Sequence, residues 1–301
     1  MTDALGWGVL GAAWIAGRAV MPAIAASRNG RVVAIASRDP DKARRLAGGH
    51  PDAKILDSYD AVLSDPDVDA VYIPLVNSLH REWSLRCFEA GKHVLCEKPL
   101  GMNAREAAEM AAAASASGRL LMEAFMYRFH PRIAAFVASV QDPLYVHATF
   151  GFPLDDPANY RLRASLGGGA LLDVGCYTVS VARWIMGEPK TVLARTRDSG
   201  GVDLTVSALL GFEGGRTASV WASFESPEEQ GLTVVTGDRT LRLERPFSAW
   251  RDPEDPYQLM VESFADSVML DRPVAIPLSE SIANMTVLDR VKEAASGEPA
   301  G

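Results

Sequence analysis

A lysine follows directly after an apolar run in the segment Glu97-Lys98-Pro99. The run before it, residues 93–96, is typical of a buried strand, and lysine is seldom buried without a partner. Open α/β sheets bind their ligands beyond the carboxyl ends of parallel strands, so Lys98 stands where a ligand would lie. The alternative is a surface lysine whose ammonium extends into solvent from the strand end. Lys98 is therefore the first candidate for a binding or catalytic cation.

A second pattern is typical of a phosphate-binding turn. The residues Gly11-Ala12-Ala13-Trp14-Ile15-Ala16 match the dinucleotide fingerprint GxGxxG/A, with alanine in place of its second glycine. In this motif the backbone approaches a pyrophosphate closely, and the N-terminus of the following helix supplies free N–H groups. The turn lies between a strand pattern and a helix pattern, which is the context that the motif requires. We expect a dinucleotide site there, rather than a ligand-free tight turn, with contacts from Gly11, Ala13, Trp14 and Ile15.

The residues that end the second strand indicate which cofactor is bound. An acidic side chain there binds the ribose 2′-hydroxyl of NAD, whereas a basic one accommodates the 2′-phosphate of NADP. Here the strand ends in Ser37-Arg38, and Asp39 belongs with Pro40 to the start of the next helix. A guanidinium can pair with a phosphate and also stack on the adenine. The sequence therefore favours NADP over NAD, with Ser37 and Arg38 as cofactor contacts.

Alternating strands and helices must position these residues. Over the first ~120 residues, short apolar runs alternate with helical patterns, as in right-handed βαβ units of a parallel sheet. The expected strands cover residues 7–10, 32–37, 70–75, 93–96 and 120–124. The expected helices cover residues 15–27, 40–47, 79–90 and 104–117.

After residue 124 the pattern changes to strands joined by turns, expected at 144–150, 191–197, 202–212, 216–224, 232–236 and 240–243. Alternation of apolar and polar residues in 202–212 predicts one buried and one polar face. Helices are expected near 170–186, 257–269 and 279–295. The fold class is therefore α/β, with a doubly wound parallel sheet in residues 1–124. Residues 125–301 are expected to form an α+β domain with an open, mostly antiparallel sheet.

Composition argues against several classes of protein. The chain has 301 residues, a net charge of −8 and a pI near 5.2, which argues against a nucleic-acid binder. Its three cysteines lack CxxC or CxxH spacing, so neither a disulfide framework nor a metal site is expected, and a cytoplasmic setting fits best. The apolar segment 5–26 contains Arg18 and four glycines and follows no basic residue, which argues against a signal peptide or membrane span.

The order of these motifs resembles that of the glucose-fructose oxidoreductase and inositol dehydrogenase family, Gfo/Idh/MocA. The resemblance covers nearly the whole chain. Within the family it is similar to the branch of NADP-dependent D-xylose 1-dehydrogenases and dihydrodiol dehydrogenases. Beyond the fingerprint, the segments that carry it are residues 34–38, 71–75, 77–80, 90–94, 97–99, 123–131 and 167–169, with Asp173, Gly175 and Tyr177.

The resemblance implies an N-terminal Rossmann domain, and a C-terminal substrate domain whose open sheet forms homodimers or homotetramers. It also implies hydride transfer between nicotinamide C4 and a hydroxyl-bearing carbon. In this chemistry Lys98 would orient and polarise the hydroxyl, Tyr177 would donate or accept its proton, and Asp173 would belong to the same site. Further cofactor contacts are implied at Pro74, Leu75, Asn77, His80, Glu97 and Arg161. Val76 departs from the branch, which often has proline there, so the loop beside the nicotinamide is expected to differ in shape.

Elementary chemistry supports these roles without the family. Asp173 and Tyr177 have the i,i+4 spacing that puts two side chains on one helix face. When a hydride leaves an alcohol carbon, the hydroxyl proton must leave too, and a group of tuned pKa must take it. A lysine cation lowers the pKa of a nearby tyrosine. The alternatives are a surface helix tyrosine and Asp173 as a cap after the glycines. The histidines lack the spacing of metal ligands, so no metal is expected.

Three functions remain open. The first is a cytoplasmic NADP-dependent dehydrogenase or reductase that acts on a sugar or cyclic polyol. The second is a dihydrodiol dehydrogenase, whose substrate ring would be flatter and more apolar. The third is a non-catalytic NADP-binding sensor, which would need neither Lys98 nor Tyr177. No nucleic acid and no membrane is expected as a partner.

Overall fold

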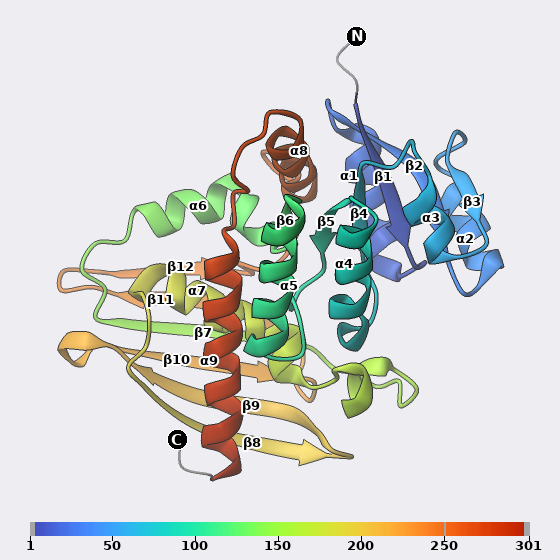
Figure 1. Ribbon diagram of the computed structural model, residues 1–301. Coiled ribbons are helices and arrows are strands. Elements are labelled where there is room, and N and C mark those ends of the chain that lie inside the picture. Colours follow the sequence, from blue (N-terminus) through green and yellow to red (C-terminus); the bar gives the residue numbers. More distant parts are fainter. Residues whose placement is uncertain (1–3, 250, 298–301) are drawn as a thin grey trace. The chain divides into compact units, whose positions relative to one another are not determined.

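The computed structural model describes residues 4–249 and 251–297 (Figure 1). Packing divides the chain into two compact units, and each is assembled from segments that are distant in sequence. The first unit contains the residues up to Leu100, Glu106–His130 and Ala249–Ser281. The second contains Gly101–Arg105, Pro131–Ser248 and the residues from Ile282 on. The expected functional division into residues 1–124 and 125–301 stays a prediction.

The first unit is built on a six-stranded parallel sheet in the order β3-β2-β1-β4-β5-β6. Its strands are β1 Leu5–Leu10, β2 Gly30–Ala36, β3 Lys54–Leu56, β4 Ala70–Ile73, β5 His93–Cys96 and β6 Leu121–Glu123. Every residue of β1 and β4 is buried, which explains their continuous apolar sequences. The strand order reverses between β1 and β4, so the crevice beyond their carboxyl ends is where a doubly wound sheet receives a dinucleotide.

Helices connect these parallel strands: α1 Met21–Ala26, α2 Pro40–Ala47, α3 Tyr59–Ser64, α4 His80–Glu89 and α5 Ala104–Ser117. A π-helical turn, Ala16–Val20, leads into α1. The sequence did not predict β3 and α3. The strand has only three residues, none of them buried, so no apolar run announces it.

Helix α8, Pro256–Met269, packs on the first unit although it comes late in the chain. The ring of Phe264 in α8 lies 5.5 Å from that of Trp7 in β1, and both side chains are buried. At the surface, the Arg28 guanidinium pairs with Asp266. The helix was expected at this place in the sequence, but its packing beside the parallel sheet was not.

The second unit contains a six-stranded sheet in the order β12-β11-β7-β10-β9-β8. Its strands are β7 Tyr145–Gly151, β8 Thr191–Ser199, β9 Val202–Gly211, β10 Thr217–Ser223, β11 Glu229–Val235 and β12 Thr240–Glu244. All neighbours are antiparallel except β7 and β10. In β9, Val206, Ala208 and Leu210 are buried and alternate with exposed Ser207 and Leu209. The prediction of a parallel sheet followed by an open, mostly antiparallel one is confirmed.

Three helices accompany the second sheet: α6 Pro131–Ala138, α7 Cys176–Met186 and α9 Leu278–Ser296. A π-helical turn, Leu171–Gly175, precedes α7 without a break. Helix α7 packs against β7 and β10. In α9, Asn284 Nδ2 donates a hydrogen bond to the carbonyl oxygen of Cys176, 3.2 Å away, which fixes the start of α7.

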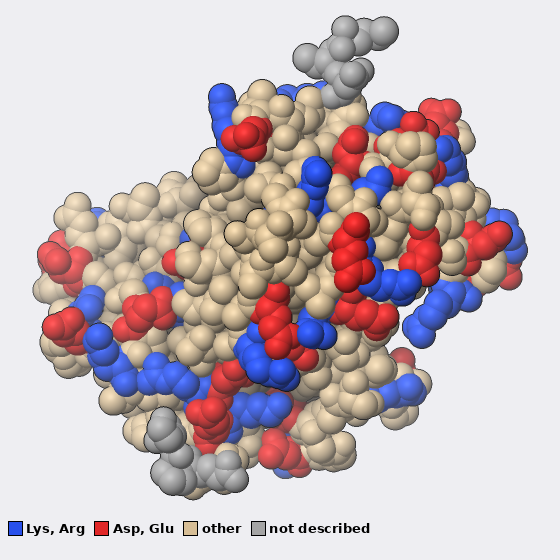
Figure 2. All heavy atoms as spheres, in the orientation of Figure 1, with Lys and Arg blue, Asp and Glu red and all other residues tan. Residues whose placement is uncertain are grey.

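The surface shown in Figure 2 carries acidic and basic side chains interspersed, in keeping with the net charge of −8. In the described part of the chain, no helix is long and apolar enough to cross a membrane. Cys87, Cys96 and Cys176 are buried and stand outside any disulfide. Across residues 4–249 and 251–297, no cluster of three His, Cys, Asp or Glu side chains has the arrangement of a metal site.

Candidate active site

The fingerprint turn begins where β1 ends. Gly11 has a φ of +99°, and its N–H donates to the carbonyl oxygen of Ala36 at 2.7 Å. A Cβ at this position would lie 2.8 Å from Cδ2 of Leu75, the second residue after the end of β4. Only glycine fits this close approach of backbone to side chain. The turn is therefore open for a pyrophosphate, as the first glycine of a dinucleotide fingerprint requires.

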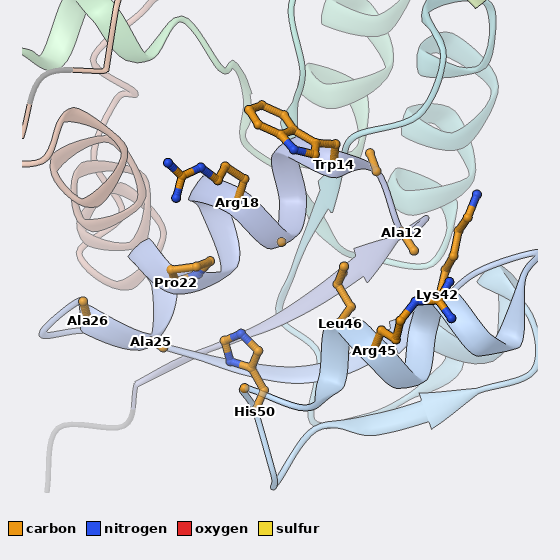
Figure 3. A pocket seen from close by; sticks show the side chains of 13 residues that line it. Ala12, Trp14, Arg18, Pro22, Ala25, Ala26, Lys42, Arg45, Leu46 and His50 are labelled. Atoms are coloured by element: carbon orange, nitrogen blue, oxygen red, sulfur yellow. The ribbon is translucent and has the colours of Figure 1, made fainter. Parts of the chain in front are cut away.

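A groove runs beside the fingerprint, between the π-helical turn with α1 and helix α2 (Figure 3). Ala13 and Trp14 are among the residues that line it, and Trp14 is 76% exposed. Three cationic side chains line the groove and no acidic one does; they are Arg18, Lys42 and Arg45. His50 also lines it, and burial lowers the pKa of this histidine. In a chain of net charge −8, this concentration of cations suits an anionic ligand. Ile15 is half-buried at the start of the helix.

Arg38 follows β2 and is exposed, whereas Ser37 is half-buried. The Arg38 guanidinium interacts with the hydroxyl of Tyr59, whose pKa is raised by burial and lowered in part by this cation. The same hydroxyl lies 3.5 Å from the position of a Cβ on Gly11. Tyr59 was missed by the sequence analysis because it begins α3, which no apolar pattern predicted. Its ring packs edge-on against Trp83 at 4.8 Å.

Lys98 is half-exposed directly beyond β5 and lies between residues fixed by buried carboxylates. Glu97 is 9% exposed, and its Oε1 accepts a 2.7 Å hydrogen bond from the hydroxyl of Tyr72 in β4. On the other side, the N–H of Leu100 donates to Oε1 of the fully buried Glu123 at 2.9 Å. Two side-chain contacts from neighbouring strands thus anchor the backbone on both sides of Lys98.

His80 connects the two loops that carry the predicted nicotinamide-side residues. Its ring is completely buried, with Nδ1 2.8 Å from the carbonyl oxygen of Pro99 and Nε2 3.0 Å from that of Leu75. Burial lowers the pKa of His80, while the two carbonyl oxygens oppose this effect. Pro74 and Asn77, which precede His80 in the sequence, are also buried. His80 therefore holds the loop after β4 against the loop after β5.

The remaining predicted residues lie in the second unit. Asp173 is in the π-helical turn and Tyr177 in the first turn of α7, and they are 5% and 7% exposed. The Arg161 Nε–H donates to Asp173 Oδ2 at 2.7 Å. Burial opposes the charge on Arg161, but the Asp173 carboxylate outweighs it and raises the pKa of the guanidinium. The family resemblance implied Arg161 as a cofactor contact and the other two as catalytic residues, and these roles stay predictions. The second unit brings Arg161 and Asp173 into contact.

Aromatic side chains surround Tyr177. Its ring lies 5.5 Å from that of Phe150 in β7 and 5.4 Å from that of Phe247, and these two phenylalanines stack on each other at 5.3 Å. Such packing fixes the tyrosine ring by area and by edge-to-face contact. These contacts define the position of the Tyr177 ring.

Comparison with known proteins defines the family. The model of the oxidoreductase family with an NAD-binding Rossmann fold, GFO_IDH_MocA, matches residues 5–125. The model of the GFO/IDH/MocA C-terminal domain matches residues 140–241. The chain belongs to the GFO/IDH/MocA family. The family resemblance found in the sequence is confirmed.

Three kinds of enzyme in the family are similar to this chain. A D-xylose 1-dehydrogenase (NADP(+)) of Haloferax volcanii is 39% identical, over 96% of this chain and 97% of its own length. A trans-1,2-dihydrobenzene-1,2-diol dehydrogenase of Xenopus laevis is 39% identical over 62% of this chain and 59% of its own. Among solved structures, a tyrosine-to-phenylalanine variant of KijD10, a 3-ketoreductase of Actinomadura kijaniata in complex with TDP-benzene and NADP, has a TM-score of 0.90. It is 29% identical over 97% of this chain and 98% of its own.

These comparisons bear on two of the predictions. That the protein is an enzyme of the NAD(P)-dependent oxidoreductase kind is confirmed by the family and by these relatives. The choice of NADP as cofactor is confirmed by the same relatives, since the xylose dehydrogenase is named for NADP and the ketoreductase contains it. The roles of individual side chains stay predictions.

Proposed function

We propose that the protein transfers a hydride between C4 of the NADP nicotinamide and a hydroxyl-bearing carbon of a sugar or cyclic polyol. The observation that carries this proposal is the position of Lys98. It stands beyond β5 at the same sheet edge as the Gly11 turn, on a backbone that Glu97 and Glu123 hold in place. A cation fixed there can bind the oxygen of the reacting carbon, and NADP supplies the hydride acceptor when it is bound.

Lys98 polarises the substrate oxygen in this proposal. In the oxidation direction the carbon loses a hydride and the hydroxyl loses a proton, so the developing alkoxide needs a positive charge beside it. A lysine ammonium stabilises this negative charge and lowers the pKa of the hydroxyl. The residue does not need to lose its own proton to do so.

Tyr177 takes or gives the hydroxyl proton, with its ring held by Phe150 and Phe247. A tyrosine needs a nearby cation to lower its pKa into a useful range. Asp173 precedes it by four residues and is neutralised by Arg161. The positive charge of Arg161 offsets the negative charge of Asp173, which by itself would disfavour the phenolate and raise the pKa of the tyrosine.

Arg38 and Lys42 bind the 2′-phosphate of NADP in this proposal. Arg38 is exposed beyond β2, and Lys42 lies one turn inside α2, on the wall of the basic groove. The hydroxyl of Tyr59 interacts with the Arg38 guanidinium and helps to keep it in place. The predicted Ser37, Pro74 and Asn77 stay proposed cofactor contacts, whereas His80 and Glu97 are proposed to act by holding the loops.

A dihydrodiol dehydrogenase is the second candidate. The stacked rings of Phe150 and Phe247 beside Tyr177 favour it, because aromatic faces also suit a flat apolar ring. The sensor hypothesis has no such support. Purified protein should be assayed with NADP against aldoses, inositols and cyclic diols. Turnover of a sugar or inositol supports the first proposal, turnover of cyclic diols alone supports the second, and NADP binding without any turnover would support a sensor.

The open face of the second sheet is proposed to join copies of the chain in a homodimer or homotetramer. Leu193 and Leu209 are 68% and 41% exposed on β8 and β9, and they line a depression on this sheet. Large apolar side chains in one exposed depression are typical of an interface. Light scattering should give a mass of at least two chains, and Leu193→Glu should reduce it to that of one. A cytoplasmic location is likewise a proposal.

A further inference from the structure

Asp203 lies at the N-terminal end of the helix that carries Asp173 and Tyr177. It is the second residue of β9, and its Oδ2 accepts a hydrogen bond from the N–H of Leu171 over 2.6 Å. The first N–H groups of a helix have no partners within the helix. A carboxylate supplies such a partner and also interacts favourably with the positive end of the helix dipole. Asp203 therefore caps this helix from a distant strand.

The glycine turn before the helix is shaped around Asp203. Gly169 has a φ of +112°, and a Cβ on it would lie only 2.3 Å from Oδ1 of Asp203. A Cβ on Gly168 would lie 2.4 Å from the carbonyl oxygen of Arg161, which accepts the N–H of Gly169 at 2.9 Å. The turn thus lies in close contact with Asp203 on one side and with Arg161 on the other. No larger residue fits at either glycine without movement of the backbone.

Arg161 and Asp203 hold the same turn in different ways. Arg161 contacts it through its carbonyl oxygen and pairs with Asp173 through its side chain. Asp203 fixes the N–H two residues before Asp173. Any shift of the first helical turn therefore moves Asp173 and also Tyr177, which lies one turn later.

We propose that Asp203 is a positioning residue of the reaction, which sets the place of Asp173 and Tyr177 by capping their helix. This inference rests on the proposed function, in which Tyr177 transfers the hydroxyl proton. It assigns to Asp203 no contact with substrate or cofactor. Misplacement of reacting groups by about 1 Å can cost on the order of a hundredfold in rate.

The cap depends on the charge of Asp203. Burial raises the pKa of Asp203 to about 6; the N–H of Leu171 lowers it, Asp198 raises it further, and Lys292 lowers it. Asp198 is the residue opposite Asp203 in β8, and Lys292 lies on α9. These are the charged side chains that act on Asp203 from the neighbouring elements. At pH 8 the side chain is a carboxylate, and acidification below pH 6 weakens its bond to the helix.

The test compares Asp203→Asn and Asp203→Ala with the wild type. Asparagine keeps an acceptor oxygen but does not titrate, whereas alanine removes the cap. At pH 8 we expect Asp203→Ala to lose roughly tenfold or more in kcat with little change in KM for NADP. Asp203→Asn should lie between alanine and the wild type, with a loss of about threefold, because it keeps an acceptor oxygen without the charge. The fall of wild-type kcat below pH 6 should be reduced in Asp203→Asn. Wild-type kcat in the alanine variant, or an unchanged acid limb in the asparagine variant, would overturn the proposal.

A control and a substrate-free readout separate this inference from the proposed function. Asp238→Asn, in the turn after β11, should keep the wild-type pH profile. In protein labelled with ¹⁵N-leucine, the Leu171 amide resonance should titrate near pH 6 in the wild type and not in Asp203→Asn. No titration of this resonance would contradict the cap itself. Absence of dehydrogenase activity in the wild type, with this titration present, would contradict only the proposed function.

Discussion

Arg161 and Asp173 form an ion pair of 2.7 Å in which both partners are largely removed from solvent. The exposed fractions of their side chains are 29% and 7%. Removal of one member of an ion pair at this depth is costly, because the remaining charge loses the opposite charge beside it and stays largely shielded from water. The pair lies one turn before Tyr177, so its integrity bears directly on the proposed proton transfer.

Replacement of Arg161 should therefore harm activity through Asp173. We expect Arg161→Leu to lower kcat by roughly tenfold or more, because removal of the guanidinium takes a positive charge away from Asp173 and so raises the pKa of the nearby tyrosine. The measurement is the pH dependence of kcat, whose alkaline shift distinguishes this effect from a loss of binding. Arg163→Leu, at an exposed position two residues later, is the matched control. Equal effects of the two variants would contradict the role of the pair.

Loss of the Tyr177 hydroxyl should remove turnover and spare the fold. In Tyr177→Phe the ring can still pack on Phe150 and Phe247, so the melting temperature should change little. The rate should fall about a hundredfold or more, the usual scale for an acid–base group. Steady-state kinetics and thermal unfolding measure the two effects, with Tyr145→Phe on β7 as the control. A collapse of stability with retained turnover would instead assign the hydroxyl a structural role.

The choice between cofactors should depend on Arg38. We expect Arg38→Ala to weaken NADP binding by roughly ten- to a hundredfold and NAD binding much less, since only NADP has the 2′-phosphate. Lys42→Ala should act in the same direction. Fluorescence titration of both cofactors gives the constants, and Arg44→Ala, on the same helix but paired with Asp41, is the control. An equal loss for NADP and NAD would show that Arg38 only stacks on the adenine.

The stability of the fold should depend on pH through the titration of Asp203. Its pKa is about 6 in the folded protein against an ordinary value of 3.8, so the folded state binds more protons between these values. The raised pKa of Asp203 adds to the free energy of unfolding in full below about pH 4, and this stabilisation is lost as the pH rises to 6. Because asparagine does not titrate, the melting temperature of Asp203→Asn should gain roughly 2–5 °C on that of the wild type between pH 4 and 7. A difference that is constant across this range would contradict the assignment.

The sequence predicted the parts of the structure in which apolar periodicity is strong. The strands that end before Gly11, Arg38 and Lys98 are fully or mostly buried, so their patterns were clear and the strand-end residues could be identified. The strand β3 was not predicted because it is short and exposed, and Tyr59 was lost with the helix that follows it. A motif indicates which residues do chemistry but not which distant side chains hold them.

Contacts between distant segments account for the remaining differences. Nothing near Asp203 in the sequence indicates that its carboxylate reaches the N–H of Leu171, 32 residues earlier. Likewise, the pattern of α8 predicted a helix, but it did not predict the ring contact between Phe264 and Trp7 that places this helix beside β1. The contact of His80 with the carbonyl oxygen of Pro99, 19 residues later, belongs to this class too, since a lone histidine has no pattern.

The central claim is that Lys98 polarises the reacting hydroxyl, and Lys98→Met tests it most directly. Methionine keeps much of the side-chain volume and removes the charge. With the best substrate of the panel, stopped-flow absorbance of NADPH should show hydride transfer slowed by at least about a hundredfold, with the Kd for NADP within about threefold of the wild type. Lys190→Met, at an exposed position in the second unit, should behave as the wild type. Hydride transfer at the wild-type rate in Lys98→Met would contradict the account.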